Sequence, residues 1–298
     1  MPLDQGALRM LLLRSSLVFV VTAAIAGTVI VGARAAEPTD PRQDRRARVP
    51  RPRPLPQGRC EIAGSGSNVP LVRRLARAFE ERHPGERIVV HDSIGSSGGV
   101  RATLDSVVHI GLVSRPLEEA EARAGLRAIA HVRVPVVLGA HPSVRDSSLP
   151  MSRLVDLVRG RTVKWSDGRR AVLLHRERGD SSNRVLLEKS TPLRRAYRDA
   201  LGRTHFRVLF HETEMVSALA QTPGSVGFVD LGVLRLVDEP LALVRIDGLD
   251  PDGADYPYMK DLFFVVRGEP RGVAARFLEF VRTSDARELA TNADYRPL

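Results

Sequence analysis

The run Gly95-Ser96-Ser97-Gly98-Gly99 constrains the fold most, because it lies between an apolar segment at 88–91 and a helix-like segment at 100–107. A strand that enters a glycine-rich turn and continues into a helix leaves backbone N–H groups unpaired at the helix start. The positive end of the helix dipole lies behind them, so such a turn can hold an anion. Glycine and serine also cap helices without a ligand, and one turn alone therefore does not predict a site.

The same arrangement recurs at three other places in the chain. Two are the turns Gly64-Ser65-Gly66-Ser67-Asn68 and Gly179-Asp180-Ser181-Ser182-Asn183, and the third is Ser114-Arg115-Pro116 after the apolar run 107–113. Four helices are thus predicted to start with hydroxyl side chains. Together they predict an anion site rather than isolated caps.

Apolar segments that alternate with helix-like ones predict an α/β fold with mainly parallel sheets, in which ligands bind at the carboxyl ends of strands. The predicted strands are 61–63, 88–91, 110–113, 132–138, 172–175, 207–210, 226–229, 241–246 and 262–266, and the predicted helices include 70–82, 100–107 and 273–282. About 240 residues are enough for two lobes of ordinary size. The apolar runs 134–139 and 262–266 are the candidate crossovers between them.

The net charge of +10 is concentrated near the amino terminus. Residues 1–59 contain ten arginines and four acidic residues, which leaves 35 basic and 31 acidic residues for 60–298. With 5% aromatic residues and only three lysines, the chain shows no basic stripe interleaved with stacking rings, so we expect no nucleic-acid partner. The single cysteine, Cys60, and eight scattered histidines predict no metal site and no cofactor.

The amino-terminal segment predicts export. Residues 15–32 are apolar and uncharged, and Ala33-Arg34-Ala35 fits a secretory cleavage site, so we interpret 1–35 as a signal peptide. An uncleaved membrane anchor is the alternative. Residues 36–59 are rich in proline and arginine and predict a disordered tether. We therefore expect a periplasmic or other extracytoplasmic location, with membrane contact only through the amino-terminal segment.

In chain order, these turns resemble the signature of the periplasmic phosphate-binding proteins of ABC importers. The resemblance rests on the four turns, on Arg176 before the last of them, and on Trp165-Ser166-Asp167-Gly168, Pro223-Gly224-Ser225-Val226-Gly227-Phe228 and Tyr256-Pro257. It covers residues 60–298. It implies a two-lobed periplasmic-binding-protein-like fold with a hinge, with lobe 1 formed by 60–138 and 257–298 and lobe 2 by 139–256.

The resemblance also implies a function: a monomer that captures phosphate, or a similar tetrahedral oxyanion, between the lobes for an ABC transporter permease. The residues that fall on ligand-binding positions, or lie in the same turns, are Asn68, Ser96, Ser97, Gly98, Ser114, Arg176, Asp180, Ser181 and Ser182. Uncharged donors at helix starts can neutralise a dianion, and a guanidinium fork suits two phosphate oxygens.

The sequence departs from the family pattern at the turns themselves. Asn68 stands where the family usually has serine or threonine, and Ser114 where it often has aspartate. A carboxylate can accept the proton of hydrogen phosphate, whereas sulfate has no proton to offer. We therefore predict that Asp180 supplies this selectivity from the facing loop, with a plain helix cap as the alternative.

Two other functions fit parts of the sequence. The run Gly95-Ser96-Ser97-Gly98-Gly99 matches the Gly-x-Ser-x-Gly elbow of α/β-hydrolases, with Ser97 as nucleophile. The elbow comes early, no His-Gly-Gly motif precedes it, and the last histidine is His211, so we expect no enzyme. The other alternative is an exported or anchored phosphate-sensing or surface module, since fold does not fix function.

Overall fold

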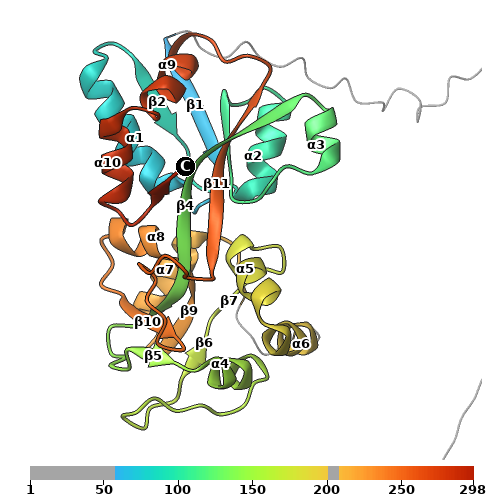
Figure 1. The fold of residues 1–298 in the computed structure, drawn as a ribbon, viewed down its shortest axis with the longest axis vertical. Helices are drawn as coiled ribbons and strands as arrows, with labels where there is room; N and C mark the ends of the chain where they lie inside the picture. Colours follow the sequence, from blue (N-terminus) through green and yellow to red (C-terminus); the bar gives the residue numbers. More distant parts are fainter. Residues whose placement is uncertain (1–57, 201–207) are drawn as a thin grey trace, which may run out of the picture. The chain divides into compact units, whose positions relative to one another are not determined.

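The computed structural model describes residues 58–200 and 208–298, which form a mixed α/β fold (Figure 1). The predicted signal peptide, 1–35, and the predicted tether up to residue 57 lie outside the described residues. Among the residues described, no helix combines the length and the apolar character needed to cross a bilayer.

The strands are β1 (Arg59–Gly64), β2 (Arg87–Val90), β3 (Ile110–Val113), β4 (Leu126–Ala140), β5 (Ser148–Leu149), β6 (Val172–Leu173), β7 (His175–Arg176), β8 (Val208–Leu209), β9 (Ser225–Asp230), β10 (Ala242–Ile246), β11 (Met259–Arg267) and β12 (Arg296–Pro297). The helices are α1 (Val69–Arg82), α2 (Gly95–Leu104), α3 (Glu119–Arg123), α4 (Met151–Val158), α5 (Ser181–Lys189), α6 (Thr191–Ala200), α7 (Glu212–Gln221), α8 (Leu231–Leu236), α9 (Gly272–Phe280) and α10 (Ser284–Thr291).

The main sheet has the strand order β2-β1-β3-β11-β4-β10-β5, with β9 and β12 also paired to β4. β1 is parallel to β2 and β3, but β11 is antiparallel to β3 and β4, and β9 and β10 are antiparallel to β4. The sheet is therefore mixed, and the prediction of mainly parallel sheets is wrong. An apolar run predicts a buried strand but does not indicate its partner or direction, and here the late strand β11 inserts between β3 and β4.

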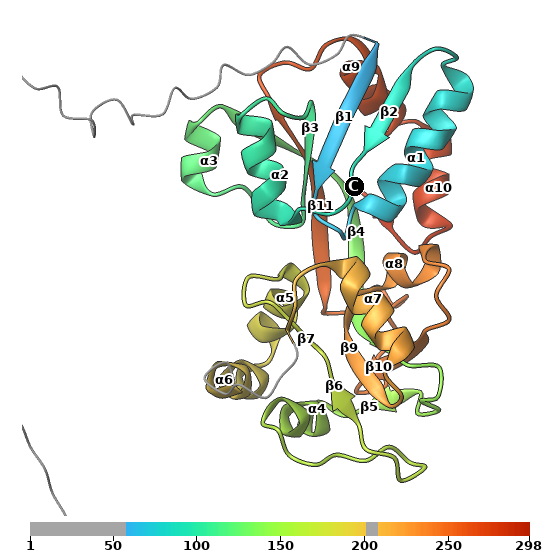
Figure 2. The ribbon, with the colours of Figure 1, turned by 180° about the vertical axis from the view of Figure 1, so that it is seen from behind.

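The 15-residue strand β4 links the two halves of this sheet. Its residues up to Pro135 pair with β11, whereas residues 136–140 pair with β9, and 138–140 also with β10. Figures 1 and 2 show β4 and β11 running together between the upper and lower groups of elements. The predicted strand 132–138 is the central part of β4.

Two main hydrophobic cores flank the middle of β4. The first core region comprises β1–β3, α1, α9, α10 and the parts of β4 and β11 that pack with them, and it contains Leu71, Leu75 and Phe79 from one face of α1. Phe79 makes an edge-to-face contact with Phe277 of α9, with ring centroids 5.6 Å apart. This spacing of apolar residues buries one stripe of the helix, as the sequence predicts.

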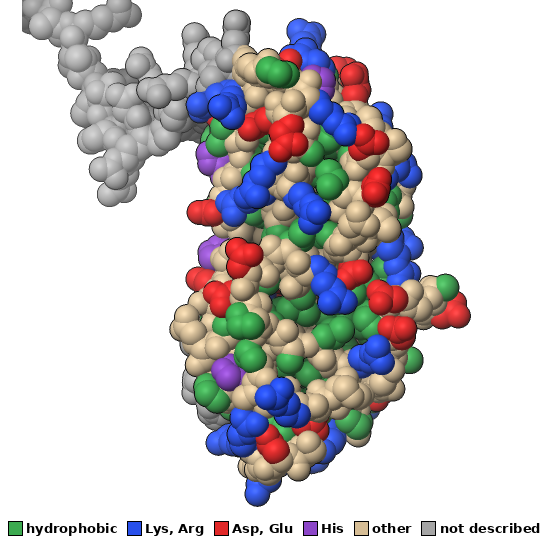
Figure 3. Space-filling view, turned by 90° about the vertical axis from the view of Figure 1, so that its left-hand side faces the viewer, with side chains coloured by type: hydrophobic (Ala, Val, Ile, Leu, Met, Phe, Trp, Pro, Cys, Tyr) green, Lys and Arg blue, Asp and Glu red, His purple; other side chains and the backbone are tan. Residues whose placement is uncertain are grey.

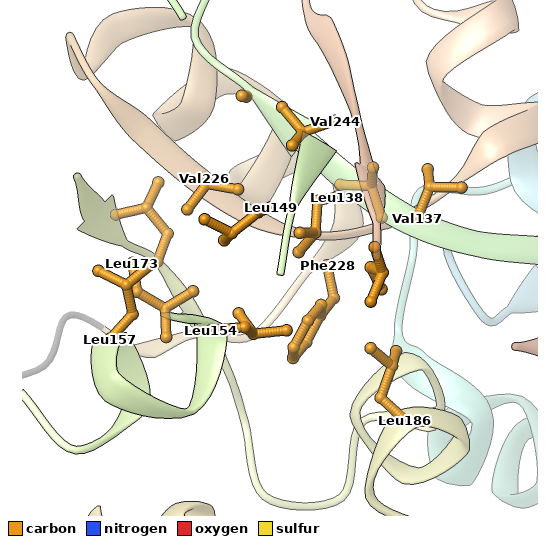
Figure 4. Packing of buried hydrophobic residues seen from close by; sticks show 14 of the residues in the cluster. Val137, Leu138, Leu149, Leu154, Leu157, Leu173, Leu186, Val226, Phe228 and Val244 are labelled. Carbon is orange, nitrogen blue, oxygen red and sulfur yellow. The ribbon is translucent and has the colours of Figure 1, made fainter. Parts of the chain in front are cut away.

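The second core region comprises β6, β9, β10, the end of β4, and helices α4–α7. Leu138 of β4, Phe228 of β9 and Val244 of β10 lie close to Leu154 of α4 and Leu186 of α5 in its interior (Figure 4). The packing of α5 on this core fixes the start of that helix, where three of the predicted site residues lie.

α2 begins at Gly95, five residues before the predicted helix, so the glycine-rich turn is itself the first helical turn. The helix lies close against β1 and β3. A Cβ atom at Gly99 would lie 2.9 Å from the Cα atom of Gly64 and 2.8 Å from the carbonyl oxygen of Leu112. Only glycine permits this approach, which brings the start of α2 to the carboxyl ends of both strands.

Candidate functional site

A cavity of about 280 Å³ lies where β1, β3 and β7 end and α2 and α5 begin. The side chains on its surface that carry hydroxyl or charged groups are Ser65, Ser67, Ser93, Ser96, Ser97, Ser114, Arg115, Arg176, Glu177, Asp180, Ser181 and Arg184. Because β1 and β3 are parallel neighbours, their carboxyl ends meet at one edge of the sheet. The turns that follow these strands therefore face the same space.

One side of the cavity is formed by the hydroxyl wall, which we define as Ser65, Ser67, Ser96 and Ser114. Ser114 Oγ lies 3.0 Å from Ser65 Oγ and 3.1 Å from Ser96 Oγ, and the Ser114 backbone N–H donates to Ser96 Oγ at 3.2 Å. Ser181 Oγ of α5 lies 2.8 Å from Ser114 Oγ and joins this group. Hydroxyl groups from four separate segments thus converge, and each can donate a hydrogen bond to a bound oxyanion.

On the side of β7 and α5, Arg176 and Asp180 line the cavity. With Glu212 and Asp230, which are buried and do not line the cavity, they make up what we define as the charged wall. Arg176 is 8% exposed, and its Nε and Nη2 atoms donate to Asp180 Oδ2 at 3.2 and 3.0 Å. Its Nη2 atom also lies 3.7 Å from Glu212 Oε2, while Nη1 has no hydrogen-bond partner within the described residues. The guanidinium is therefore held on one side and retains free N–H groups.

Asp180 fixes the start of α5. Its Oδ1 atom accepts from the backbone N–H groups of Ser182 and Asn183 at 3.0 and 3.1 Å, which makes it the N-cap of the helix. The Asn183 amide donates to the hydroxyl of Tyr197, which in turn donates to the Arg176 carbonyl oxygen at 3.0 Å. The strand end and the helix start are therefore held together by side chains of α5 and α6.

Lys260 of β11 lies directly behind the cavity surface and is 5% exposed. Its ammonium group donates to Ser67 Oγ at 2.8 Å, Ser181 Oγ at 3.1 Å and Ser182 Oγ at 2.8 Å. It also forms an ion pair with Asp230 Oδ1 at 2.8 Å. One side chain therefore contacts both sides of the site.

Glu212 opens α7 and is 3% exposed. Burial disfavours its charged form and raises its pKa to about 7, although Arg176 acts in the opposite direction. Burial also disfavours the charge on Arg176, but Glu212 and Asp180 outweigh this and raise its pKa. Arg176 therefore stays charged, while Glu212 titrates near neutral pH.

Six of the predicted site residues lie on the cavity surface: Ser96, Ser97, Ser114, Arg176, Asp180 and Ser181. Three do not. Ser182 lies behind the surface and bonds to Lys260, and a Cβ atom at Gly98 would meet the Ile94 side chain. Asn68 is fully buried, and its amide donates to the Val113 carbonyl oxygen while its Oδ1 atom lies 2.8 Å from His131 Nε2.

Sequence reasoning missed Lys260, Glu212 and Asp230. The signal for Lys260 is weak but present, since it is one of three lysines and adjoins the apolar run 262–266. Asp230 ends the apolar strand β9, which is where side chains of a site are expected. Ser65 and Ser67 lie inside a turn that the sequence did single out, although only Asn68 was selected from it.

Charge elsewhere on the surface is of both signs. On the face shown in Figure 3, acidic and basic side chains are interspersed rather than gathered in a patch of one sign. A groove of about 720 Å³ between α1, α7 and α8 is lined by Arg73, Arg74 and Arg77, but also by Asp238 and Glu239. Within the part of the chain that the structure describes, no group of three or more His, Cys, Asp or Glu side chains could hold a metal ion.

Comparison with known proteins gives one consistent result. The family model described as a PBP superfamily domain matches residues 49–285. The phosphate-binding protein PstS of Bacillus subtilis (strain 168) is 24% identical over 257 residues, which cover 81% of each chain. PstS 2 of Streptococcus agalactiae is 30% identical over 112 residues, which is 37% of either chain.

Two solved structures show the same fold. A phosphate ABC transporter substrate-binding protein from Clostridium perfringens, solved with bound phosphate, superposes with a TM-score of 0.66 at 20% identity over 80% of this chain and 99% of that one. The regulatory domain of CcmR from Synechocystis PCC6803, solved with 2-PG, gives a TM-score of 0.51 at 17% identity over 76% and 96%. At these identities the likeness concerns the fold alone.

Proposed function

The chain belongs to the PBP superfamily, and from this premise we propose that it is an extracytoplasmic solute-binding protein that captures phosphate or a similar tetrahedral oxyanion. The proposed ligand site is the cavity between the hydroxyl wall and Arg176. The proposed partner is the permease of an ABC importer, which takes the anion from the binding protein.

The observation that carries the proposal is the convergence of Ser65, Ser96, Ser114 and Ser181 next to the unpartnered Nη1 atom of Arg176. Hydroxyl groups cost little to desolvate compared with charges, and together they can surround an oxyanion with donors. A buried guanidinium N–H without a partner is rare, and it would be satisfied by an anionic oxygen.

Phosphate is favoured over other anions by the distant PstS relatives and by the phosphate carried by the Clostridium perfringens structure. The cavity is also of suitable size, because about 280 Å³ accommodates a small anion with a few waters but no large organic ligand. No residue on the cavity surface is a histidine among those described, which argues against Ser97 as an activated nucleophile.

We also propose that two lobes close around the ligand. Ser114 and Ser181 belong to the first and second core regions, and their 2.8 Å contact joins them across the cavity. Entry of an anion requires this contact to open, with β4 and β11 as the connecting strands. Small-angle scattering should then show a smaller radius of gyration with saturating phosphate, and identical curves would contradict closure.

The deciding experiment is isothermal titration of the full-length protein with phosphate, and with sulfate, arsenate and molybdate for comparison. We expect one phosphate site of micromolar or tighter affinity, about −8 kcal/mol or better. Thermal unfolding with and without phosphate provides an independent measure, because a ligand that binds only the native state raises the melting temperature. The absence of both heat and thermal shift would overturn the proposal.

A further inference from the structure

Lys260 has an arrangement that the proposed function does not yet explain. Its side chain is buried behind the cavity, yet its ammonium contacts the hydroxyls of Ser67, Ser181 and Ser182 within 3.1 Å. Ser67 belongs to the hydroxyl wall, and the two other serines begin α5. The lysine therefore touches the groups that would bind the anion without lying on the cavity surface itself.

An ammonium group has three N–H donors and no acceptor, whereas a serine hydroxyl can both donate and accept. Its three N–H groups are shared among four oxygens, those of the three hydroxyls and Asp230 Oδ1. Since the lysine cannot accept, each hydroxyl turns its oxygen toward the ammonium and its own proton elsewhere. Ser182 donates to Asp230 Oδ1 at 3.3 Å. Ser181 can donate to Ser114 Oγ, 2.8 Å away, until the proposed entry of an anion opens this contact, and the Ser67 hydroxyl has no other hydrogen bond within the described residues.

We propose that Lys260 is a positioning residue that fixes the hydroxyls of Ser67 and Ser181 as donors toward the bound anion. The inference rests on the proposed function and refines it. Hydroxyls fixed as donors at Ser67 and Ser181 match unprotonated oxygens of the anion, which can only accept hydrogen bonds. A proton carried by the anion must then face another part of the site.

Asp230 offsets the free-energy cost of burying the charge of Lys260. Its Oδ1 atom lies 2.8 Å from Lys260 Nζ, and the residue is fully buried. The pair is neutral as a whole, so Lys260 orders the hydroxyls without adding net charge to the cavity. Removal of the lysine alone would leave a buried carboxylate without its counter-ion, which is strongly destabilising.

The test therefore replaces both partners, as Lys260→Met with Asp230→Asn, which leaves the net charge unchanged. Binding of phosphate and of monofluorophosphate is measured at pH 8 by titration of the full-length protein. Both anions are tetrahedral and dianionic at this pH, but monofluorophosphate has fluorine in place of the O–H group and cannot donate. Lys189→Met, at an exposed lysine of α5, is the matched control.

We expect the double variant to bind both anions about 10- to 100-fold more weakly than the parent. The reason is that the hydroxyls of Ser67 and Ser181 are no longer oriented by Lys260, so two hydrogen bonds to the anion are weakened. Monofluorophosphate should lose about five-fold more than phosphate, because freed hydroxyls can accept the phosphate proton. The control should bind like the parent. An equal loss for both anions would show a merely structural role and overturn the inference, as would unchanged affinities.

The Ser67→Ala variant keeps the inference testable if the double variant does not fold. This change removes a hydroxyl that contacts Lys260 but leaves the ion pair intact. Affinity for both anions should fall about five- to ten-fold, and parental affinity would overturn the inference. A parent protein that binds neither anion would overturn the proposed function and the inference together, whereas a binding parent with an unaffected variant overturns the inference alone.

Discussion

The two sides of the cavity accommodate buried polar groups in different ways. The hydroxyl wall consists of neutral serines that follow strands or begin a helix, and they hydrogen-bond to one another at about 3 Å. The charged wall consists of buried acidic and basic side chains, with Arg176 paired to Asp180 and Asp230 paired to Lys260. The hydroxyl wall therefore loses little free energy on desolvation, whereas the charged wall depends on its ion pairs.

The charges around the cavity nearly balance, since Arg115, Arg176 and Arg184 line it together with Glu177 and Asp180. Arg176 and Lys260 face three buried carboxylates, those of Asp180, Asp230 and Glu212. Attraction by net charge is therefore small, and an anion bound as proposed would depend on directed donors. Each of the following substitutions alters one wall, and the expected losses of phosphate affinity and of stability differ between the walls.

Arg176→Ala should have the largest effect. The variant loses the one guanidinium on the cavity surface that is buried, and we expect phosphate affinity to fall by roughly 2–4 kcal/mol. Native-state stability should fall as well, since Asp180 and Glu212 lose their counter-ion. Titration measures the first effect and thermal unfolding the second. Arg178→Ala, at an exposed arginine of the same loop, is the control, and a folded Arg176→Ala protein with parental affinity would contradict the role.

Glu212→Gln should change how stability depends on pH. Burial raises the pKa of Glu212 from 4.5 to about 7, so the native state holds this proton more tightly than the unfolded state. The resulting stabilisation is complete below pH 4.5 and is lost as pH rises through 7, by up to about 3 kcal/mol. The glutamine variant lacks this loss, so relative to the parent it should be more stable at pH 8 than at pH 5.

Denaturant unfolding at both pH values measures this difference. Glu214→Gln is the control on the same helix, because backbone N–H groups of Phe210 and His211 lower the pKa of Glu214. Its stabilisation is present at high pH and declines as pH falls, so its variant should not gain at pH 8. Parallel pH profiles for the Glu212 variant and the parent would show that Glu212 does not titrate in this range.

Ser114→Ala tests the hydroxyl wall at its centre. The hydroxyl of Ser114 contacts those of Ser65, Ser96 and Ser181, so its loss removes one donor and loosens three others. We expect phosphate affinity to fall about ten-fold, with little change in stability. Ser152→Ala on the exposed side of α4 should have no effect. A much larger loss of stability than of affinity would mean that the wall is structural.

Asp180→Asn should have the smallest effect on affinity. An asparagine can still cap α5 through its carbonyl oxygen, but it removes the carboxylate that accepts from Arg176. If Asp180 favours hydrogen phosphate over sulfate, the ratio of the two affinities should fall a few-fold, because the amide can donate to sulfate. An unchanged ratio would leave Asp180 with capping and pairing alone.

The sequence indicates those parts of the candidate site that depend on local rules. A carboxylate before a helix caps that helix wherever it lies, so the role of Asp180 as N-cap of α5 follows from its turn alone. Ser96 and Ser181 lie in the first turns of α2 and α5, where the sequence places them, although neither is the N-cap. Asn68 shows the limit of this reasoning. It precedes α1 as expected, but its side chain hydrogen-bonds to His131 of β4, a strand distant in sequence, and does not line the cavity.

The residues that sequence could not reveal depend on strand order. Lys260 reaches Ser67 and Ser181 because β11 pairs with both β3 and β4, and apolar runs do not indicate pairing partners. For the same reason the sheet is mixed where parallel strands were predicted. Glu212 looks like an ordinary acidic residue at a helix start, and only its burial against Arg176 makes it unusual.

The insertion of β11 between β3 and β4 has a consequence for how the chain acquires its structure. Val266 pairs with Arg127, and β3 and β4 remain unjoined until residues 259–267 are present. Contacts so distant in sequence make folding slow, since a long loop must close before they form. During synthesis the first half can therefore collapse but cannot complete its sheet. If the chain is exported as proposed, this delay keeps it unfolded for longer before it crosses the membrane. Truncation before residue 259 should abolish native structure, which circular dichroism would measure.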